Sequence, residues 1–252
     1  MHMAVIFNPV AGARRRNHFR VAMERLRAGG CEPSIAETTG PGDAGRLATA
    51  LAGDRVDRLL VAGGDGTINE VVNGMAWLAS PPELAILPLG TANVLAHEIG
   101  LTADAVAETA LAGDARPITV GDVSGRRFLL MAGIGLDAHV VAGVDGGLKR
   151  RIGKGAYAWS FAQRLFDFSF PGYRYRTAEG EGIAASLVLA NARHYGGRHV
   201  LAPTAGLEKD GLALCAVDGA GALGAVAAGV RLFSGAYGRR EGKVAPLVGR
   251  VE

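Results

Sequence analysis

A glycine-rich turn between an apolar strand and an amphipathic helix constrains this chain more than any other segment. The strand is expected at residues 58–62 and runs directly into Gly63-Gly64-Asp65-Gly66-Thr67. Apolar residues then recur at helical spacing from Ile68 to Met75, which predicts a helix over residues 67–78. Glycines let backbone N–H groups approach a ligand, and the first turn of a helix favours negative charge. The segment therefore predicts a phosphate-binding turn.

The same residues also fit a plain tight turn in which Asp65 or Thr67 caps the helix. Three glycines and an aspartate within five residues exceed what a cap needs, so a ligand-binding turn is the preferred interpretation. The turn matches neither the G-x-G-x-x-G fingerprint nor the G-x-x-x-x-G-K-[ST] P-loop. Asp65 would place a carboxylate beside the phosphate, which requires a divalent cation or a transferable proton.

Two further turns fit the same site. One follows an expected strand at residues 4–8 and leads into a helix at 17–28, and the other follows a strand at 84–87 and leads into a helix at 92–99. A parallel sheet binds ligands at its carboxyl edge, so all three turns are expected to converge there. Taken alone, the Gly90 turn fits an N-cap equally well. The candidate residues of these two turns are Asn8, Pro9, Gly12, Gly90, Thr91 and Asn93.

Composition fits an ordinary enzyme with room for two domains. The 252 residues carry a net charge of +3, which weakly favours anionic partners and gives no case for nucleic acid. Cys31 and Cys215 form no disulfide framework. The longest uncharged apolar run, residues 219–230, is too short to span a bilayer, and a first strand at 4–8 leaves no room for a signal peptide. We therefore expect a cytoplasmic protein, and homodimer formation is left open.

The order of elements predicts two domains. Residues 1–115 alternate strands and helices, as in a doubly wound α/β domain or a related layer. After Pro117 the pattern changes to a hairpin around Ser124-Gly125, and strand-like runs follow, so residues 116–252 predict a mostly β domain. The remaining expected elements are strands at 33–37, 118–123, 126–131, 183–191 and 212–217 and helices at 43–52 and 104–112.

Residues 157–175 hold eight of the fifteen aromatic side chains and follow a basic run at residues 149–154. An aromatic amphipathic helix behind a basic loop suits peripheral contact with anionic lipid headgroups. The preferred alternative is that one aromatic face packs on the β domain and the basic loop is merely solvated. Both can hold for different faces.

Five blocks resemble, in order, the motifs of the diacylglycerol kinase catalytic-domain family, which includes bacterial lipid kinases and sphingosine kinases. They cover nearly the whole chain: Asn8–Gly12, Gly63–Glu70, Leu87–Asn93, Ala132–Ala138, and Leu201–Pro203 leading to Asp210–Leu212. NAD kinases and phosphofructokinases share the Gly-Gly-Asp-Gly-Thr turn, so that turn fixes only the superfamily. The Gly-Thr-Ala-Asn, Ala-Pro and Asp-Gly-Leu blocks favour the lipid kinases.

The resemblance implies an NAD-kinase- or phosphofructokinase-like α/β domain followed by a mostly β, sandwich-like lipid-substrate domain, with the site in the cleft between them. It also implies Mg²⁺-dependent transfer of the γ-phosphate of ATP to a hydroxyl of diacylglycerol or a related lipid alcohol, as in phospholipid biosynthesis. A soluble NAD-kinase-like enzyme and an inactive nucleotide or lipid binder are the alternatives.

The resemblance also assigns site residues. Asp65 would be catalytic, either holding Mg²⁺ through water or assisting the acceptor hydroxyl, and the sequence does not separate these roles. Asn69 and Glu70 would orient the site or simply cap the helix. Asp210, with the carbonyls of Leu207 and Leu212, matches the family's divalent-cation loop, although Asp-Gly is also a common β-turn. The implied ATP contacts are Asn8, Pro9, Gly12, Thr38, Gly63, Gly64, Asp65, Gly66, Thr67, Asn69, Glu70, Gly90, Thr91 and Asn93.

One departure from the family pattern concerns the general base. Family members continue into a segment with Asp-Gly-Glu, whose glutamate is taken as the base, whereas this chain stops at Glu252 without it. Glu241-Gly242 lacks the preceding Asp-Gly and is not accepted as a substitute. We expect that the second domain is C-terminally incomplete, that Asp65 is the only nearby base, or that the chain no longer catalyses. Loss of a positioned base typically costs about 10²–10⁴ in rate.

Overall fold

The computed structural model describes most of the chain as two compact units. The described residues are 1–11, 15–51, 55–143, 159–163, 167–177, 180–217, 221–234 and 244–247. The first unit comprises residues 1–117 and 124–128, and the second comprises residues 118–123 and 129–252. A parallel sheet in the first unit and antiparallel sheets in the second confirm the expected α/β class.

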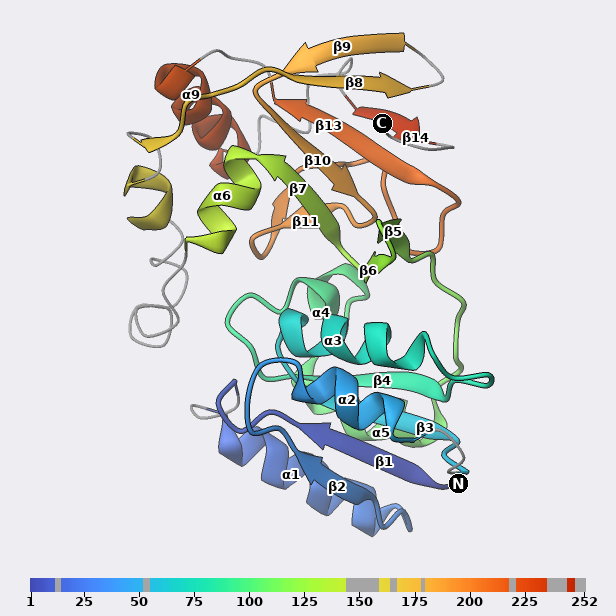
Figure 1. The fold of residues 1–252 in the computed structure, drawn as a ribbon. Coiled ribbons are helices and arrows are strands. Elements are labelled where there is room, and N and C mark those ends of the chain that lie inside the picture. Colours follow the sequence, from blue (N-terminus) through green and yellow to red (C-terminus); the bar gives the residue numbers. More distant parts are fainter. Residues whose placement is uncertain are drawn as a thin grey trace. The chain divides into compact units, whose positions relative to one another are not determined.

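The first unit is built on a four-stranded parallel sheet in the order β2-β1-β3-β4 (Figure 1). Its strands are β1 (Met3–Phe7), β2 (Ser34–Glu37), β3 (Arg58–Gly63) and β4 (Glu83–Pro88). Its helices are α1 (Arg16–Ala28), α2 (Asp43–Thr49), α3 (Asp65–Met75), α4 (Val94–Glu98) and α5 (Val106–Ala112), with a 3₁₀ turn η1 (Ala103–Ala105). Helix α3 begins two residues earlier than expected, inside the glycine-rich turn itself.

Helices cover both faces of this sheet. Every residue of β1 is buried, and alternate residues Met3, Val5 and Phe7 pack in one cluster with side chains of α1 and α5. On the other face, α2 and α3 pack against each other and contact β1 and β3 (Figure 1). The unit is therefore doubly wound, which leaves the carboxyl ends of the strands for loops.

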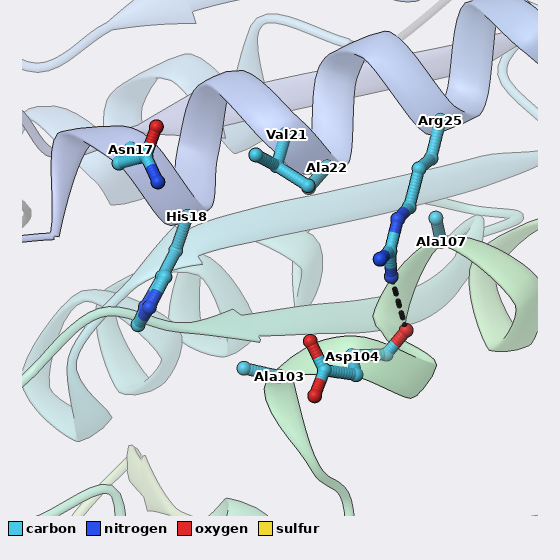
Figure 2. Close-up of a pocket in the computed structure, with 8 residues that line it drawn as sticks. All are labelled: Asn17, His18, Val21, Ala22, Arg25, Ala103, Asp104 and Ala107. Atoms are coloured by element: carbon cyan, nitrogen blue, oxygen red, sulfur yellow. Dashed lines mark hydrogen bonds between the residues drawn. The ribbon is translucent and has the colours of Figure 1, made fainter.

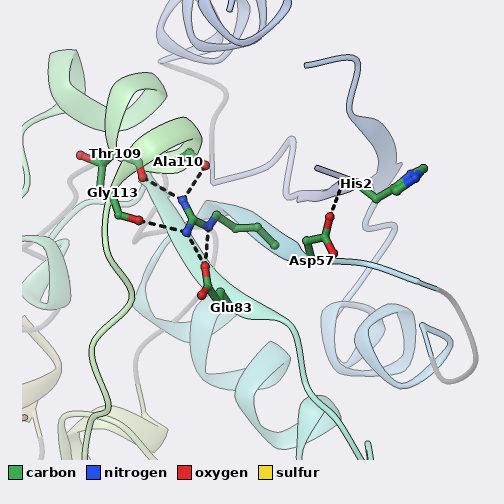
Figure 3. Close-up of polar contacts among 7 residues, drawn as sticks. His2, Asp57, Glu83, Thr109, Ala110 and Gly113 are labelled. Carbon is green, nitrogen blue, oxygen red and sulfur yellow. Dashed lines mark hydrogen bonds and ion pairs between the residues drawn. The ribbon is translucent and has the colours of Figure 1, made fainter. Parts of the chain in front are cut away.

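Arg58 ties the start of the central strand to the end of a helix. Its guanidinium pairs with Glu83 of the neighbouring strand, and its Nη1 donates to the carbonyl oxygen of Ala110 at 2.8 Å (Figure 3). Further bonds reach the carbonyls of Thr109 at 3.2 Å and Gly113 at 3.0 Å. The last carbonyls of a helix have no N–H partner within the helix, so a cation at the end of α5 is stabilising.

We expect Arg58→Met to lower the free energy of unfolding by about 2–3 kcal/mol, because several carbonyl and carboxylate acceptors lose a charged donor. Arg58→Lys should recover only part of this loss, since an ammonium group cannot reproduce the planar fork. Urea denaturation of the three proteins measures the effect. Equal stability of Arg58→Met and the parent would contradict this account of the α5 end.

The second unit is organised around antiparallel strands in the order β14-β13-β10-β7. Its strands are β5 (Gly121–Val123), β7 (Met131–Gly135), β8 (Tyr173–Thr177), β9 (Gly180–Ala184), β10 (Ser186–Ala190), β11 (His194–Tyr195), β12 (His199–Val200), β13 (Leu212–Val217) and β14 (Val244–Leu247). Its helices are α6 (Leu136–Ala142) and α9 (Gly221–Phe233). Strand β6 (Arg126–Phe128) follows the hairpin turn and counts with the first unit.

The hairpin expected around Ser124-Gly125 is present, and both residues have positive φ, 53° and 80°. The expected strand 126–131 is wrong in its extent, because β6 ends at Phe128. The chain then enters β7, which pairs with β10 in a different sheet. No helix among the described residues is long and apolar enough to cross a bilayer.

The aromatic segment is not one helix. Residues 159–163 are helical, but Tyr173 and Tyr175 lie on strand β8. Phe161, Phe168 and Phe170 pack against a small cluster from α6 and α9, which supports core packing for those three rings. The basic run at residues 149–154 lies outside the described residues.

Both cysteines are buried and unpaired in the structure. Burial raises the pKa of the Cys215 thiol to about 12, so this side chain behaves as a small apolar residue of the β13 core.

Candidate functional site

Three turns meet at the carboxyl end of the parallel sheet in the first unit. They follow β1 at Asn8, β3 at Gly63 and β4 at Pro88, and a backbone hydrogen bond of 2.9 Å from Leu89 N to the Gly63 carbonyl joins the last two. Asn8 N likewise donates to the Ala62 carbonyl at 2.9 Å. The three turns are therefore parts of one packed structure rather than separate loops.

Asn8 joins the first turn to the start of α3. Its side-chain nitrogen donates to Thr67 Oγ1 at 2.9 Å, and its Oδ1 accepts the N–H groups of Val10 and Ala11, each at 3.1 Å. Thr67 is buried and sits against Gly63, where an added Cβ would lie 2.7 Å from the threonine Cβ. Asn8 and Thr67 thus hold the turns together through a side-chain hydrogen bond, and Thr67 packs on the backbone of Gly63.

Asp65 connects α3 to the turn after β4. Its two carboxylate oxygens accept the N–H groups of Val94 and Leu95, each at 3.0 Å. These are the first N–H groups of α4, which have no carbonyl partner within their own helix. Asp65 is therefore the N-terminal cap of a neighbouring helix, a role different from a cap on α3. Each oxygen keeps a second acceptor position for a further donor or a cation.

Gly64 and Gly90 are in direct backbone contact. A Cβ built on Gly90 would lie 2.6 Å from the Cα of Gly64 and 2.9 Å from Asn93 Oδ1, so neither turn has room for a side chain there. Arg15 holds the Gly90 turn from the other side, donating to the carbonyl oxygens of Gly90 at 2.6 Å and Pro88 at 3.3 Å. The glycines at 64 and 90 serve close packing of the two turns.

Gly66 differs from these glycines. Apart from its chain neighbours and the backbone of its own helix, no described atom lies within 4 Å of the position that a Cβ would take at Gly66, and the residue is exposed on the first turn of α3. Thus Gly66 offers the open backbone surface and helix N-terminus that a phosphate group requires.

Substitution should separate these two kinds of glycine. We expect Gly90→Ala to lower the free energy of unfolding by about 1–3 kcal/mol, because the new methyl group meets backbone that cannot move independently. Gly66→Ala should leave stability unchanged or raise it by up to about 1 kcal/mol, as alanine does in helices. Thermal and urea unfolding of both variants gives the comparison, and equal losses would contradict the geometry described here.

The other expected ATP contacts are spread around these turns. Thr38 is buried at the end of β2, with its N–H donating to the Phe7 carbonyl at 2.9 Å, and Thr91 is exposed in the Gly90 turn. Pro9 follows β1, while Gly12 lies outside the described residues. Asn93, the residue that precedes α4, makes no capping bond with its side chain and adopts a left-handed conformation with φ 47°.

Asn69 and Glu70 lie on α3 beyond its first turn. Asn69 donates to the carbonyl of Arg127 at 3.2 Å, and Asn73, one turn later, exchanges bonds of 2.9 Å with the N–H and carbonyl of the same residue. These contacts fix β6 to α3. Sequence reasoning missed Asn73 and Arg15, although the i, i+4 spacing of the two asparagines was a usable signal.

The expected cation loop precedes β13 in the second unit. Asp210 is exposed, and the Leu207 carbonyl already accepts the Thr119 N–H at 2.7 Å, while Thr119 Oγ1 donates to the Lys209 carbonyl at 2.8 Å. Carbonyl oxygens have two lone pairs, so Leu207 keeps one acceptor position, and an all-oxygen set suits a hard cation. The loop contributes a single carboxylate, that of Asp210. The described residues hold no cluster of three or more His, Cys, Asp or Glu that could bind a metal.

Asp137 is a second acid that sequence reasoning did not single out. It lies in the first turn of α6, where it accepts a hydrogen bond from the hydroxyl of Tyr195. Burial raises the pKa of its carboxyl above the ordinary value of 3.8, and the bond from Tyr195 only partly opposes this shift. A carboxyl with a raised pKa is a candidate functional group as well as a source of pH-dependent stability.

Because the folded-state pKa is raised, Asp137 costs stability as pH rises from 3.8 through its folded-state value, and this cost is absent at lower pH. We expect Asp137→Asn to have a higher thermal midpoint than the parent at pH 7 and to lose this advantage towards pH 4. Tyr195→Phe should have a lower thermal midpoint than the parent at pH 7, because the charged Asp137 loses its hydrogen bond. A difference in thermal midpoint between the parent and Asp137→Asn that does not change with pH would contradict the burial argument.

A hollow of about 170 Å³ lies between α1 and the η1–α5 segment (Figure 2). It is bordered by Asn17, His18, Val21, Ala22, Arg25, Ala103, Asp104 and Ala107. Arg25 spans one side by donating to the Asp104 carbonyl at 2.9 Å. Pockets for small molecules usually exceed about 300 Å³, and none of the expected ATP contacts borders this one, so it is not the nucleotide site.

Comparison with known proteins shows what the chain is similar to. Residues 2–123 match the diacylglycerol kinase catalytic domain. A diacylglycerol kinase of Bacillus subtilis is 38% identical over 157 residues, which are 61% of this chain and 52% of that protein. A YegS-like lipid kinase of Pseudomonas aeruginosa is 37% identical over 201 residues, 77% of this chain and 65% of that protein. The matches thus span between half and two thirds of the length of these relatives.

Solved structures agree with the sequence relatives. A diacylglycerol kinase structure from Bacillus anthracis str. Sterne aligns with a TM-score of 0.68 at 25% identity and covers 96% of this chain and 79% of that one. A second structure from the same organism gives a TM-score of 0.70 at 26% identity, over 92% of this chain and 78% of that one. Residues 2–123 therefore match a diacylglycerol kinase catalytic domain, and the expected resemblance to that kinase family is confirmed.

Proposed function

We propose that this protein is an ATP-dependent lipid kinase, transferring the γ-phosphate to a hydroxyl of diacylglycerol or a related lipid alcohol. The names of its relatives support a kinase of this class. The observation that carries the proposal is the joint packing of three turns at the carboxyl end of the sheet, with Gly66 left open beside them.

In this proposal the phosphates lie against the first turn of α3. The N–H groups of Asp65, Gly66 and Thr67 are the first three of that helix and have no carbonyl partner within it. The open space at Gly66 would let phosphate oxygens approach this backbone closely. Asn8 and the Gly90 turn would act by holding the helix start in place, which is the positioning that phosphoryl transfer depends on.

Asp65 is our candidate catalytic residue. Because backbone N–H groups fix both of its oxygens, the carboxylate would enter the reaction already oriented. Its remaining acceptor positions would orient a water on Mg²⁺ or take the proton of the lipid hydroxyl. The loop of Leu207, Asp210 and Leu212 would hold a divalent cation, which when bound neutralises negative charge.

The test is transfer of radiolabelled γ-phosphate from Mg-ATP to diacylglycerol, phosphatidylglycerol, a sphingoid base or NAD, with the lipids in mixed micelles. We expect label on a lipid and none on NAD. Asp65→Asn should lower the rate by about 10²–10⁴. Gly66→Val should weaken ATP binding about tenfold or more, because its side chain fills the space the phosphates need.

Ala28→Val is the matched control, since Ala28 is exposed at the last residue of α1, at the opposite edge of the sheet. Its rate and ATP affinity should equal those of the parent. Label on NAD alone would favour the NAD-kinase alternative. Unchanged transfer in Asp65→Asn would remove Asp65 from the catalytic role, and ATP binding without any transfer would indicate a nucleotide binder.

A further inference from the structure

Helix α9 packs on the second unit through its small residues. Ala225 is buried in a cluster with Leu136 and Val140 of α6. A Cβ at Gly229, one turn later, would lie 3.9 Å from the ring of Phe161, so that ring packs closely over the helix backbone. Among the side chains that the structure describes, Ala225 and Gly229 therefore form the inner face of α9.

Three large aliphatic residues of α9 lie on its outer face. Leu223, Val226 and Val230 are exposed to 87%, 40% and 62%, and their i, i+3, i+7 spacing aligns them in one stripe. Ordinary surface helices have the opposite arrangement, with large apolar residues towards the core. We call these three residues the α9 stripe. An exposed apolar stripe on a helix that is already packed indicates a further binding partner.

Charge indicates which partner fits. Between Asp218 and Glu241 the sequence has no acidic residue and three arginines, Arg231, Arg239 and Arg240. Arg231 is exposed in the last turn of α9. A second copy packed on the α9 stripe would bring two arginine-rich segments together without an acid between Asp218 and Glu241 to balance them, whereas an anionic bilayer supplies the opposite charge.

We propose that the α9 stripe is a membrane-docking surface, on which α9 lies against an anionic lipid bilayer with Leu223, Val226 and Val230 entering the interface. Arg231 contacts lipid phosphates, with its aliphatic stem along the apolar surface. The proposal rests on the proposed function in one respect, that a lipid acceptor resides in a bilayer. It differs from docking by the aromatic segment, since Phe161, Phe168 and Phe170 are engaged in packing.

The test is cosedimentation of the protein with phosphatidylcholine vesicles, with and without phosphatidylglycerol. The parent should bind the anionic vesicles at least about tenfold more tightly than the neutral ones, and salt should weaken the binding. Leu223→Glu with Val230→Glu should reduce binding at least about tenfold, and Arg231→Gln should reduce the preference for anionic lipid. Because the three positions are exposed, circular dichroism and thermal midpoints should stay as in the parent.

Trp77→Glu, at an 82% exposed apolar position in the first unit, is the matched control and should bind vesicles as the parent does. Parent-like binding by the Leu223→Glu, Val230→Glu protein would overturn the proposal. So would a parent that binds no vesicles but shows concentration-dependent dimerisation by light scattering that the double variant loses, because the stripe would then join two copies.

Transfer to a short-chain, water-soluble diacylglycerol separates this proposal from the proposed function. We expect the double variant to retain that activity while losing vesicle binding. Vesicle binding through the stripe without transfer in any assay would refute the kinase and leave the docking surface standing. If the parent and the double variant both transfer phosphate and bind vesicles equally well, the docking surface is refuted and the kinase stands.

Discussion

The arrangement of the sheet's carboxyl end depends on one carboxylate. Asp65 starts α3 and binds the first two N–H groups of α4, so a residue of the glycine-rich turn sets the position of the next helix. Gly64 and Gly90 are in direct backbone contact beside it. Arg15 completes the arrangement by holding the carbonyl side of the Gly90 turn. The candidate phosphate site is consequently a by-product of how three turns pack, which makes its geometry rigid before any ligand arrives.

Glycine in this motif has two physical functions that sequence alone does not distinguish. At positions 64 and 90 a side chain would collide with backbone, and at Gly63 it would collide with Thr67. At Gly66 the described surroundings are open, so the absence of a side chain there has no packing explanation. The tight, closely packed turn is thus observed at Gly63, Gly64 and Gly90, whereas ligand binding at Gly66 stays a prediction.

Periodicity predicted most of the fold because it reports local burial. The parallel strands, the flanking helices and the Ser124-Gly125 hairpin all appear near their expected residues. The prediction of one aromatic helix was wrong because it relied on the number of aromatic residues and overlooked their spacing. Tyr173, Tyr175 and Thr177 alternate with arginines, and this alternation is typical of a strand. Contacts such as Arg58 with the α5 end, Arg15 with Gly90 and Tyr195 with Asp137 join residues far apart in sequence, so no local pattern carries them. The roles of the expected ATP and cation residues stay predictions.

The bonds from Asp65 to α4 have a consequence for how this region can vary. Both donors are main-chain groups, so any residue except proline at positions 94 and 95 can provide them. Val94 is the first residue of α4, a position at which proline is ordinarily welcome. Here proline would remove a donor that Asp65 needs. The requirement is thus the exclusion of proline at positions 94 and 95 together with an acid 29 and 30 residues earlier, and the remaining side chains of α4 do not reveal it.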